Sequence, residues 1–204
     1  MKVLVACEFS GVVRDAFIKR GHDAISCDIL PSEAPGPHHM GDVTELLNQR
    51  FDLMIAHPPC TYLTNSGVKH LHTDITRWFK LFDAAEFFKK LLNAPNITHI
   101  AVENPIMHRY AREIIGSKQS QIVQPWMFGH TESKATGFWL KNLPPLFETM
   151  NVKQEMQQLP KKDTHKVHYA PPGKDRWKNR SVTCQGIADA MAEAAREVDV
   201  PIRW

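Results

Sequence analysis

Three residues with reactive or acidic side chains fall just past the ends of predicted β-strands: Asp28, Cys60 and Glu103. In a doubly wound α/β sheet the carboxyl ends of the parallel strands lie along one edge, where ligands bind, so we expect these side chains to converge. Pro58 and Pro59 end the strand before Cys60 and restrict the turn, which should hold the thiol in one place. A cysteine thiolate is a strong nucleophile, and a carboxyl group can hold or supply a proton. The pattern indicates nucleophilic chemistry; the alternative is a loop that happens to contain a cysteine.

A second group of residues is placed to bind a cofactor. Phe9, Ser10 and Gly11 follow the first predicted strand, and Asp28 ends the second. An acidic residue about 20 positions after a glycine-bearing first turn is the arrangement that hydrogen-bonds a ribose. The glycine pattern is incomplete, because Val13 stands where a dinucleotide-binding turn has its second glycine. For Asp28 the alternative is a helix N-cap or a turn residue.

Apolar runs and helical periodicity predict the elements that must position these residues. Strands are predicted at residues 2–7, 24–27, 53–56 and 100–102, and helices at 12–20, 74–93 and 186–198. Two strands joined by a helix of this length form a right-handed βαβ unit, so we expect an α/β fold with a mostly parallel sheet.

The rest of the chain is less regular. Residues 121–123 and 137–140 predict two further strands in a hairpin-like pair. Residues 141–179 contain five prolines and no sustained period, so we expect a long irregular connection there.

The composition suits a soluble protein of one domain, residues 1–204. With 43% hydrophobic and 23% charged residues, a chain of 204 residues can bury a proper core. We expect no membrane partner, because no stretch has the length and apolarity of a membrane span and the N-terminal run is too short for a signal peptide. The four cysteines show no Cys-x-x-Cys spacing, which indicates a reducing, cytoplasmic environment.

Charged and histidine-rich stretches give weaker evidence about nucleic-acid and metal binding. A net charge of +3 permits a nucleic-acid partner without requiring one. Basic residues surround Trp177 at positions 174–180 and can follow a phosphate backbone, although a solvated loop is the default for such a stretch. The histidines of the first third lack a metal-binding spacing, so we expect loop histidines and no metal site. They are His38, His39, His57, His70 and His72.

Together these residues resemble the motifs of the DNA cytosine-5 methyltransferase family, in its short phage-like form and in the family's order. The matching segments are Phe9–Ser10–Gly11, Asp28, Gly41–Asp42–Val43, Pro59–Cys60, Glu103–Asn104, and Arg180–Ser181–Val182–Thr183 leading into residues 186–192. The resemblance implies a Rossmann-like methyltransferase fold with helices on both faces of the sheet. It also implies S-adenosylmethionine as the cofactor and DNA as the partner, as a single strand or a short duplex site.

The resemblance assigns a role to each matched residue. Cys60 is then the nucleophile that adds to carbon 6 of cytosine, and Glu103 holds or protonates ring nitrogen N3. Asp28 binds the ribose of the cofactor and Asp42 its adenine. The other implied cofactor-binding residues are Phe9, Ser10, Gly11, Pro59 and Ser181, and the implied substrate-binding residues are Asn104, Lys134, Arg176 and Arg180.

The chain also departs from the family pattern. Val13 replaces the second glycine of the first motif, Pro105 stands where valine is usual, and residues 129–134 lack the family's Gln-x-Arg-x-Arg. The large target-recognition domain of the family would lie between Leu140 and Ser181, where this chain has room only for the irregular connection.

Two other functions compete with DNA cytosine-5 methylation. The same fold can act on a free pyrimidine nucleotide, or it can bind nucleic acid without catalysis. The intact pair of Cys60 and Glu103 argues against an idle binding protein, which has no need for it.

Overall fold

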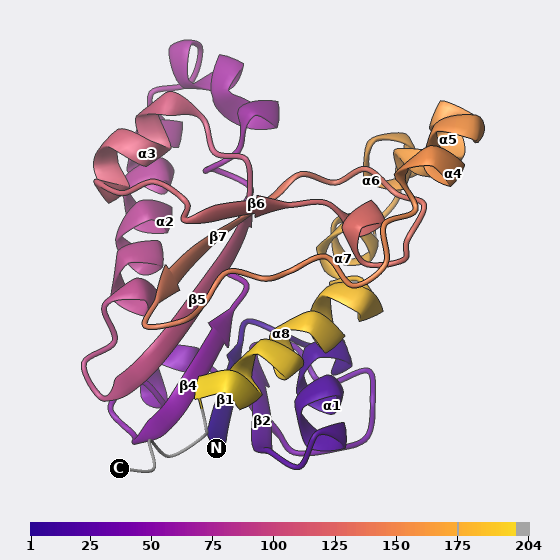
Figure 1. Ribbon diagram of the computed structural model, residues 1–204. Helices are drawn as coiled ribbons and strands as arrows, with labels where there is room; N and C mark the ends of the chain where they lie inside the picture. Colours follow the sequence, from indigo (N-terminus) through magenta and orange to yellow (C-terminus); the bar gives the residue numbers. More distant parts are fainter. Residues whose placement is uncertain (175, 199–204) are drawn as a thin grey trace.

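The computed structural model describes residues 1–174 and 176–198. Its centre is a seven-stranded sheet in the order β3-β2-β1-β4-β5-β7-β6 (Figure 1). The first five strands in this order run parallel, and β7 is antiparallel to both β5 and β6. The strands are β1 Lys2–Ala6, β2 Asp23–Asp28, β3 His38–Met40, β4 Phe51–Ala56, β5 Ile97–Pro105, β6 Gln121–Val123 and β7 Thr136–Lys141.

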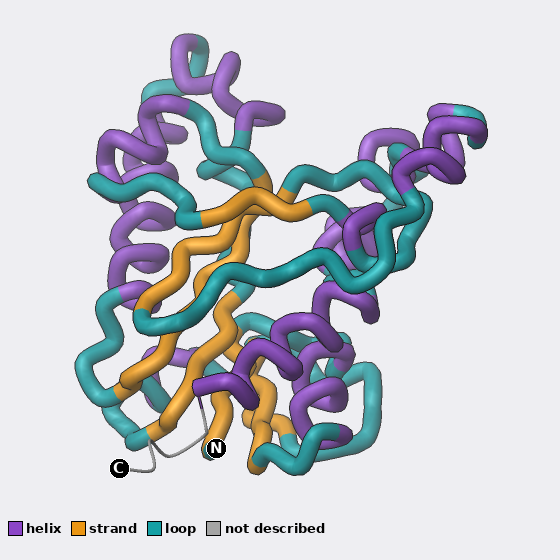
Figure 2. The backbone as a smooth tube through the Cα atoms, viewed as in Figure 1, coloured by secondary structure: helices purple, strands orange, loops and turns teal. Residues whose placement is uncertain are grey.

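Helices cover both faces of the sheet, as predicted (Figure 2). α1 Val12–Lys19 and α8 Gln185–Val198 pack on one face, and α2 Thr76–Leu92 and α3 Arg109–Ile115 pack on the other. Short 3-10 helices lie at Val43–Glu45 (η1), Asn65–His72 (η2) and Pro125–Met127 (η3).

Two-sided burial explains why the central strands are almost purely apolar. In β1, Val3 and Val5 pack among residues of α1 and α8, whereas Leu4 and Ala6 pack among those of α2 and α3. A strand of a parallel sheet that is covered on both faces needs apolar side chains at consecutive positions, not at alternate ones. The apolar runs of the sequence therefore predicted these strands correctly.

β5 extends beyond its predicted limits, and β3 was not predicted. The strand predicted at residues 100–102 continues through Glu103, Asn104 and Pro105, because these residues pair with residues 138, 137 and 136 of β7. Glu103 and Asn104 therefore lie inside β5 and not after it. No strand was predicted at residues 38–40, where the short strand β3 pairs with the end of β2.

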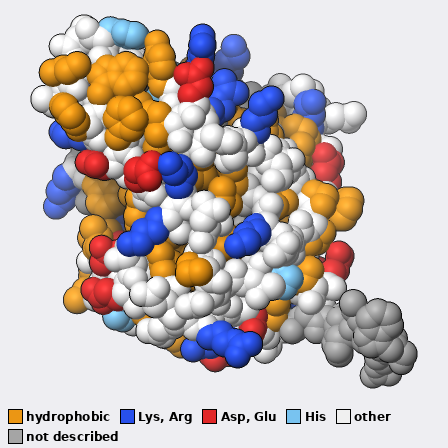
Figure 3. Space-filling view, turned by 90° about the vertical axis from the view of Figure 1, so that its left-hand side faces the viewer, with side chains coloured by type: hydrophobic (Ala, Val, Ile, Leu, Met, Phe, Trp, Pro, Cys, Tyr) orange, Lys and Arg blue, Asp and Glu red, His pale blue; other side chains and the backbone are white. Residues whose placement is uncertain are grey.

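Helix α2 was predicted correctly, but part of its apolar pattern faces outward. Leu81, Ala85, Phe88 and Leu91 are buried against the sheet, whereas an apolar stripe of Ile75, Phe79 and Phe82 is exposed. Figure 3 shows hydrophobic side chains gathered in the upper part of this face, where the amino-terminal end of α2 lies. α2 therefore carries two apolar stripes, of which only one is buried against the sheet.

The connection predicted to be irregular over residues 141–179 contains short helices, and that prediction was wrong. We call residues 142–181 the arm; its helices are α4 Lys153–Gln158, α5 Lys161–Thr164, α6 Lys166–Tyr169 and α7 Arg176–Ser181. Each helix is too short to show a period in the sequence. Pro160 precedes α5, and two adjacent prolines, Pro171 and Pro172, separate α6 from α7.

Gly186, which follows the arm, packs closely against Phe128 and His130. A Cβ atom at this position would lie 2.0 Å from the carbonyl oxygen of Phe128, so no larger residue fits. The amide nitrogen of Gly186 lies 3.0 Å from Nε2 of His130. This close approach places residues 180–183 beside the edge of the sheet that carries Cys60.

Candidate active site

A cavity lies at the carboxyl ends of β1, β4 and β5. Its walls are residues 7–10, 57–60 and 180–183, together with Glu103, Pro105 and Lys134. The chain order reverses here, because β2 and β3 lie on one side of β1 while β4 and β5 lie on the other. Such a reversal leaves a crevice between neighbouring strand ends, where open α/β sheets bind their ligands.

This cavity brings together eight of the residues implied by the resemblance. They are Phe9, Ser10, Pro59, Cys60, Glu103, Lys134, Arg180 and Ser181. Gly11, Asp28, Asp42, Asn104 and Arg176 do not line it. The cavity also includes Cys7, Glu8 and His57, to which the sequence pattern assigned no role in the site.

The turn that carries Cys60 is held at several points. The amide of His57 donates to the carbonyl of Ala6 at 2.9 Å, and Nδ2 of Asn104 donates to the carbonyl of Pro58 at 3.1 Å. The carbonyl of Cys60 accepts hydrogen bonds from the amides of Leu63 and Thr64. Asn104 is fully buried and therefore supports this turn from behind, where we had expected it to contact substrate.

The Cys60 thiol is protonated at rest. Its pKa is raised above the ordinary value, first by burial and then by the negative charge of Glu103. Lys134 and Arg180 oppose this effect without reversing it. Because only the thiolate is strongly nucleophilic, Cys60 must pass its proton to a nearby acceptor before it can attack.

Glu103 is paired with His57. Oε2 of Glu103 lies 3.2 Å from Nδ1 of His57, and the two side chains are only 13% and 8% exposed. Burial acts to raise the pKa of Glu103, but the hydrogen bond from His57 and the charge of Lys134 outweigh it, so the pKa is lowered. Glu103 is therefore a carboxylate at neutral pH. The position of His57 directly after β4, one step before Pro58, was the signal that could have identified it.

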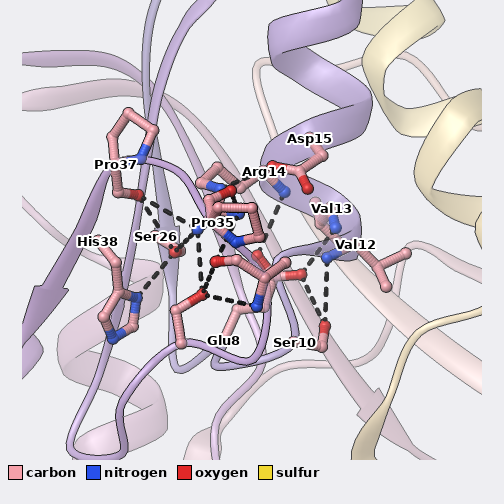
Figure 4. A network of polar contacts seen from close by, with 12 residues as sticks. Glu8, Ser10, Val12, Val13, Arg14, Asp15, Ser26, Pro35, Pro37 and His38 are labelled. Atoms are coloured by element: carbon pink, nitrogen blue, oxygen red, sulfur yellow. Dashed lines mark hydrogen bonds and ion pairs between the residues drawn. The ribbon is translucent and has the colours of Figure 1, made fainter.

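The turn after β1 is closed by its own carboxylate. Cys7 has a left-handed backbone with φ +58°, after which Glu8 turns back toward α1. Oε1 of Glu8 accepts from the amide of Val13 at 2.7 Å, and its Oε2 accepts from the amide of Arg14 at 3.2 Å (Figure 4). A helix N-terminus with free amides binds phosphate, but here a buried carboxylate occupies those amides and adds negative charge. The site therefore disfavours a pyrophosphate-containing cofactor.

Gly11 serves the geometry of this turn and does not line the cavity. It has φ +79°, a conformation that suits glycine, and a Cβ atom there would lie 2.6 Å from Nη2 of Arg14. Val13, which replaces the expected second glycine, is buried in the core. The backbone conformation and close packing of this turn therefore explain why it has a glycine at position 11 and a valine at position 13.

Arg14 organises the loop between β2 and β3, and nothing in the sequence pattern pointed to it. Its fully buried guanidinium donates to the carbonyl of Pro35 at 2.9 Å and to the hydroxyl of Ser26 at 3.3 Å, and forms an ion pair with Asp15 at 2.8 Å (Figure 4). These contacts fix the loop that leads from Asp28 toward β3.

Asp28 and Asp42 lie beside the cavity, near its Cys7 end. Oδ1 of Asp28 accepts from the amide of Leu30 at 2.9 Å, and Oδ1 of Asp42 caps η1 through the amide of Thr44 at 2.8 Å. Burial raises the pKa of the Cys7 thiol, and the charges of Asp28 and Asp42 raise it further. One end of the cavity is therefore flanked by carboxylates, and the other holds Cys60 with its neighbouring cations.

The arm closes the cavity from one side. The rings of Phe9 and Trp177 make an edge contact with centroids 6.3 Å apart, and Nζ of Lys178 lies 5.1 Å from the centroid of Phe9. Lys178 also forms an ion pair with Glu33. Arg176, an expected substrate contact, instead donates to the carbonyls of His168 and Ala170 within the arm.

Two cations line the cavity near Cys60. Nζ of Lys134 donates to the carbonyl of Arg180 at 3.2 Å. Nε of Arg180 is buried and has no hydrogen-bond partner within residues 1–174 and 176–198. Both residues line the same cavity as Cys60, and their positive charges act against the rise in the pKa of its thiol.

No protein-family model and no curated protein sequence matches this chain. Within the described residues, no group of three or more His, Cys, Asp or Glu side chains is arranged to hold a metal ion. No helix in the same part of the chain has both the length and the apolarity to cross a membrane.

Proposed function

We propose that the protein is an S-adenosylmethionine-dependent methyltransferase with a Rossmann-like fold that methylates carbon 5 of cytosine in DNA. The observation that carries the proposal is that Cys60 and Glu103 line one cavity at the reversal point of the sheet, where the negative charge of Glu103 acts on the thiol. A nucleophilic thiol beside a carboxyl group is the pair that cytosine-5 chemistry requires.

Carbon 5 of cytosine is a poor nucleophile until a thiolate adds at carbon 6. Cys60 supplies that thiolate, and the S–C6 bond converts the ring into an enamine-like species. Glu103, after it takes up a proton, gives that proton to ring nitrogen N3 and so neutralises the negative charge that develops there. In duplex DNA the base must leave the helix stack to reach the cavity.

The residues around the Cys7 end of the cavity fit S-adenosylmethionine. This cofactor contains no phosphate, and the turn after β1 is closed to phosphate by Glu8. Asp28 and Asp42 offer carboxylates to ribose hydroxyls and to the adenine amino group, and Phe9 offers an aromatic surface. When bound, the cofactor supplies an electrophilic methyl group on a sulfonium.

The arm supports DNA as the substrate. Residues 142–181 contain eight Lys and Arg against four Asp and Glu, a net charge of +4, so the rest of the chain has a net charge of −1. The positive charge is thus concentrated on the segment that borders the active site. Exposed aromatic side chains, Tyr169 and Trp177, lie among these cations and can stack on bases.

Product analysis tests the proposal. The purified protein is incubated with S-adenosylmethionine and unmethylated DNA, and the digested nucleosides are analysed by mass spectrometry. We expect 5-methylcytosine, and no N4-methylcytosine or N6-methyladenine. Methylation of free deoxycytidine monophosphate alone would favour the nucleotide-modifying function, and DNA binding without any product would favour the idle binding protein.

We expect Asp28→Ala to weaken binding of S-adenosylmethionine by about 1–3 kcal/mol, the usual loss when a hydrogen bond to a charged group is removed. Titration calorimetry measures the change, and Asp42→Ala should act in the same direction. Asp23→Ala is the matched control, since Asp23 lies at the opposite end of the same strand. Unchanged affinity in Asp28→Ala would show that the cofactor binds elsewhere.

A further inference from the structure

The addition step moves one proton from Cys60 to ring nitrogen N3. Cys60 begins as a thiol and must lose a proton, whereas Glu103 begins as a carboxylate and must take up a proton before it can give one to N3. A group that is hydrogen-bonded to Glu103 can hold a proton for it while the thiol ionises. This inference rests on the proposed function, because it concerns the same addition step.

His57 is placed to be that group. Its Nδ1 lies 3.2 Å from Oε2 of Glu103, and its side chain, 8% exposed, lines the cavity. Its other ring nitrogen, Nε2, is buried and has no hydrogen-bond partner in the described part of the chain. Buried polar atoms in folded proteins are nearly always paired, so an unpartnered nitrogen in a residue that lines the cavity indicates that His57 has a role beyond structural hydrogen bonding.

We propose that His57 is a positioning residue that acts through Glu103, and that the two side chains form one unit holding a single exchangeable proton. An imidazolium beside a carboxylate and an imidazole beside a carboxylic acid hold the same number of protons. The pair can therefore present either a charged or a protonated Glu103 to the substrate without a proton from solvent.

The addition step then balances. The S–H bond of Cys60 breaks and its proton passes to the pair, while the S–C6 bond forms. The π electrons of the C5–C6 bond shift toward C4 and N3, and N3 takes a proton from Glu103. The pair receives one proton and gives one, so its charge is the same before and after. After methylation a water molecule takes the proton from C5, the S–C6 bond breaks, and N3 returns its proton through the pair to the Cys60 thiolate, so the site returns to its starting state.

The other charged and titratable groups around the pair do not replace His57. Lys134 also lowers the pKa of Glu103, but its Nζ donates to the carbonyl of Arg180. Arg180 acts on Cys60, and Cys184 is a thiol whose own pKa is raised by burial. Of these neighbours, His57 is the one that makes a direct hydrogen bond to Glu103.

His57→Asn tests the inference, because asparagine can still donate a hydrogen bond to Glu103 but cannot hold the proton. Without the imidazole, Glu103 loses the charge of His57 that helps to lower its pKa, so Glu103 is more often a neutral acid. A neutral Glu103 no longer raises the pKa of Cys60, so the thiol should react faster with iodoacetamide at neutral pH. Methyl transfer should fall at the same time, by about 10²-fold or more, the usual contribution of acid–base catalysis.

The measurement is the rate of iodoacetamide labelling of the peptide that contains Cys60, followed by mass spectrometry over a range of pH, beside the pH profile of kcat. Glu103→Gln should also accelerate labelling, and adding His57→Asn to it should change labelling no further, because His57 acts through Glu103. His99→Asn, a change near the other end of β5, is the control.

Opposite changes in labelling and methyl transfer support the inference. It is overturned if both rates fall together in a folded His57→Asn protein, or if neither changes. It is also overturned if His57→Asn still alters labelling when Glu103 is already Gln. If the wild-type protein methylates nothing while labelling responds as described, the proposed function fails and the coupling of His57, Glu103 and Cys60 stands.

Discussion

Replacing Cys60 by serine is expected to lower methyl transfer by about three orders of magnitude or more while leaving the fold and cofactor binding intact. A serine hydroxyl at this position has the same reach but is far less acidic than a thiol, and no neighbouring group is strong enough to ionise it. The turn that carries residue 60 is held by backbone contacts and by Asn104, so its geometry should survive the change. Transfer of a radiolabelled methyl group to DNA measures the loss.

DNA that contains 5-fluorocytosine provides the direct test of the covalent step. The hydrogen at carbon 5 is normally removed as a proton, and the fluorine that replaces it cannot be removed as a cation. Elimination is therefore blocked, and the enzyme should remain bound to the base through Cys60. Cys184→Ser serves as the control: Cys184 is also half-buried, does not line the cavity, and should still permit trapping. An adduct that forms in the Cys60→Ser protein, or normal turnover by it, would refute the assignment.

The second large effect is expected from the arm. Lys161, Lys162 and Lys174 are exposed there, and replacing all three by Gln should weaken DNA binding at low salt. For each lysine that no longer neutralises a phosphate, the slope of log K against log salt should become shallower by about 0.9 for duplex DNA or 0.7 for a single strand. Fluorescence anisotropy with labelled DNA at several salt concentrations measures both the affinity and the slope.

A matched variant separates the arm from net charge. Lys2, Lys19 and Lys118 are also exposed but lie outside the arm, so their triple replacement by Gln removes the same charge. It should leave the salt slope nearly unchanged. Equal reductions of affinity in the two triple variants would show that DNA binding follows overall charge and not the arm.

The size of the arm also predicts low sequence specificity. Reading base edges requires several side chains held in a groove, and the arm's short helices bury few residues of their own. In bisulfite sequencing of a treated random library we expect modification in many contexts, with single strands and short sites modified about as well as long duplexes. Methylation confined to one motif of four or more bases would mean that a partner chain or the arm itself supplies the missing readout.

The sequence by itself determined the central strands β1 and β4 and the turn that carries Cys60. Apolar runs at residues 2–6 and 53–56 can be buried on both faces only in a covered parallel sheet, and two prolines can follow a strand only by ending it. These are local constraints, and they were sufficient to place Cys60 at the carboxyl edge of the parallel sheet. The helical period of α2 was likewise visible, but period alone does not show which of two apolar stripes meets the sheet.

Only the tertiary structure decided the partners of the reactive groups. β5 extends through Glu103 because β7, more than thirty residues later, supplies its hydrogen bonds. The pairing of His57 with Glu103 depends on two strands that are adjacent in space, although the two residues are 46 positions apart in sequence. Trp177 and Lys178 of the arm contact Phe9. This contact depends on the close approach of Gly186, at the start of α8, to the carbonyl of Phe128. Such contacts have no local pattern, since they arise from chain packing and not from the preferences of neighbouring residues.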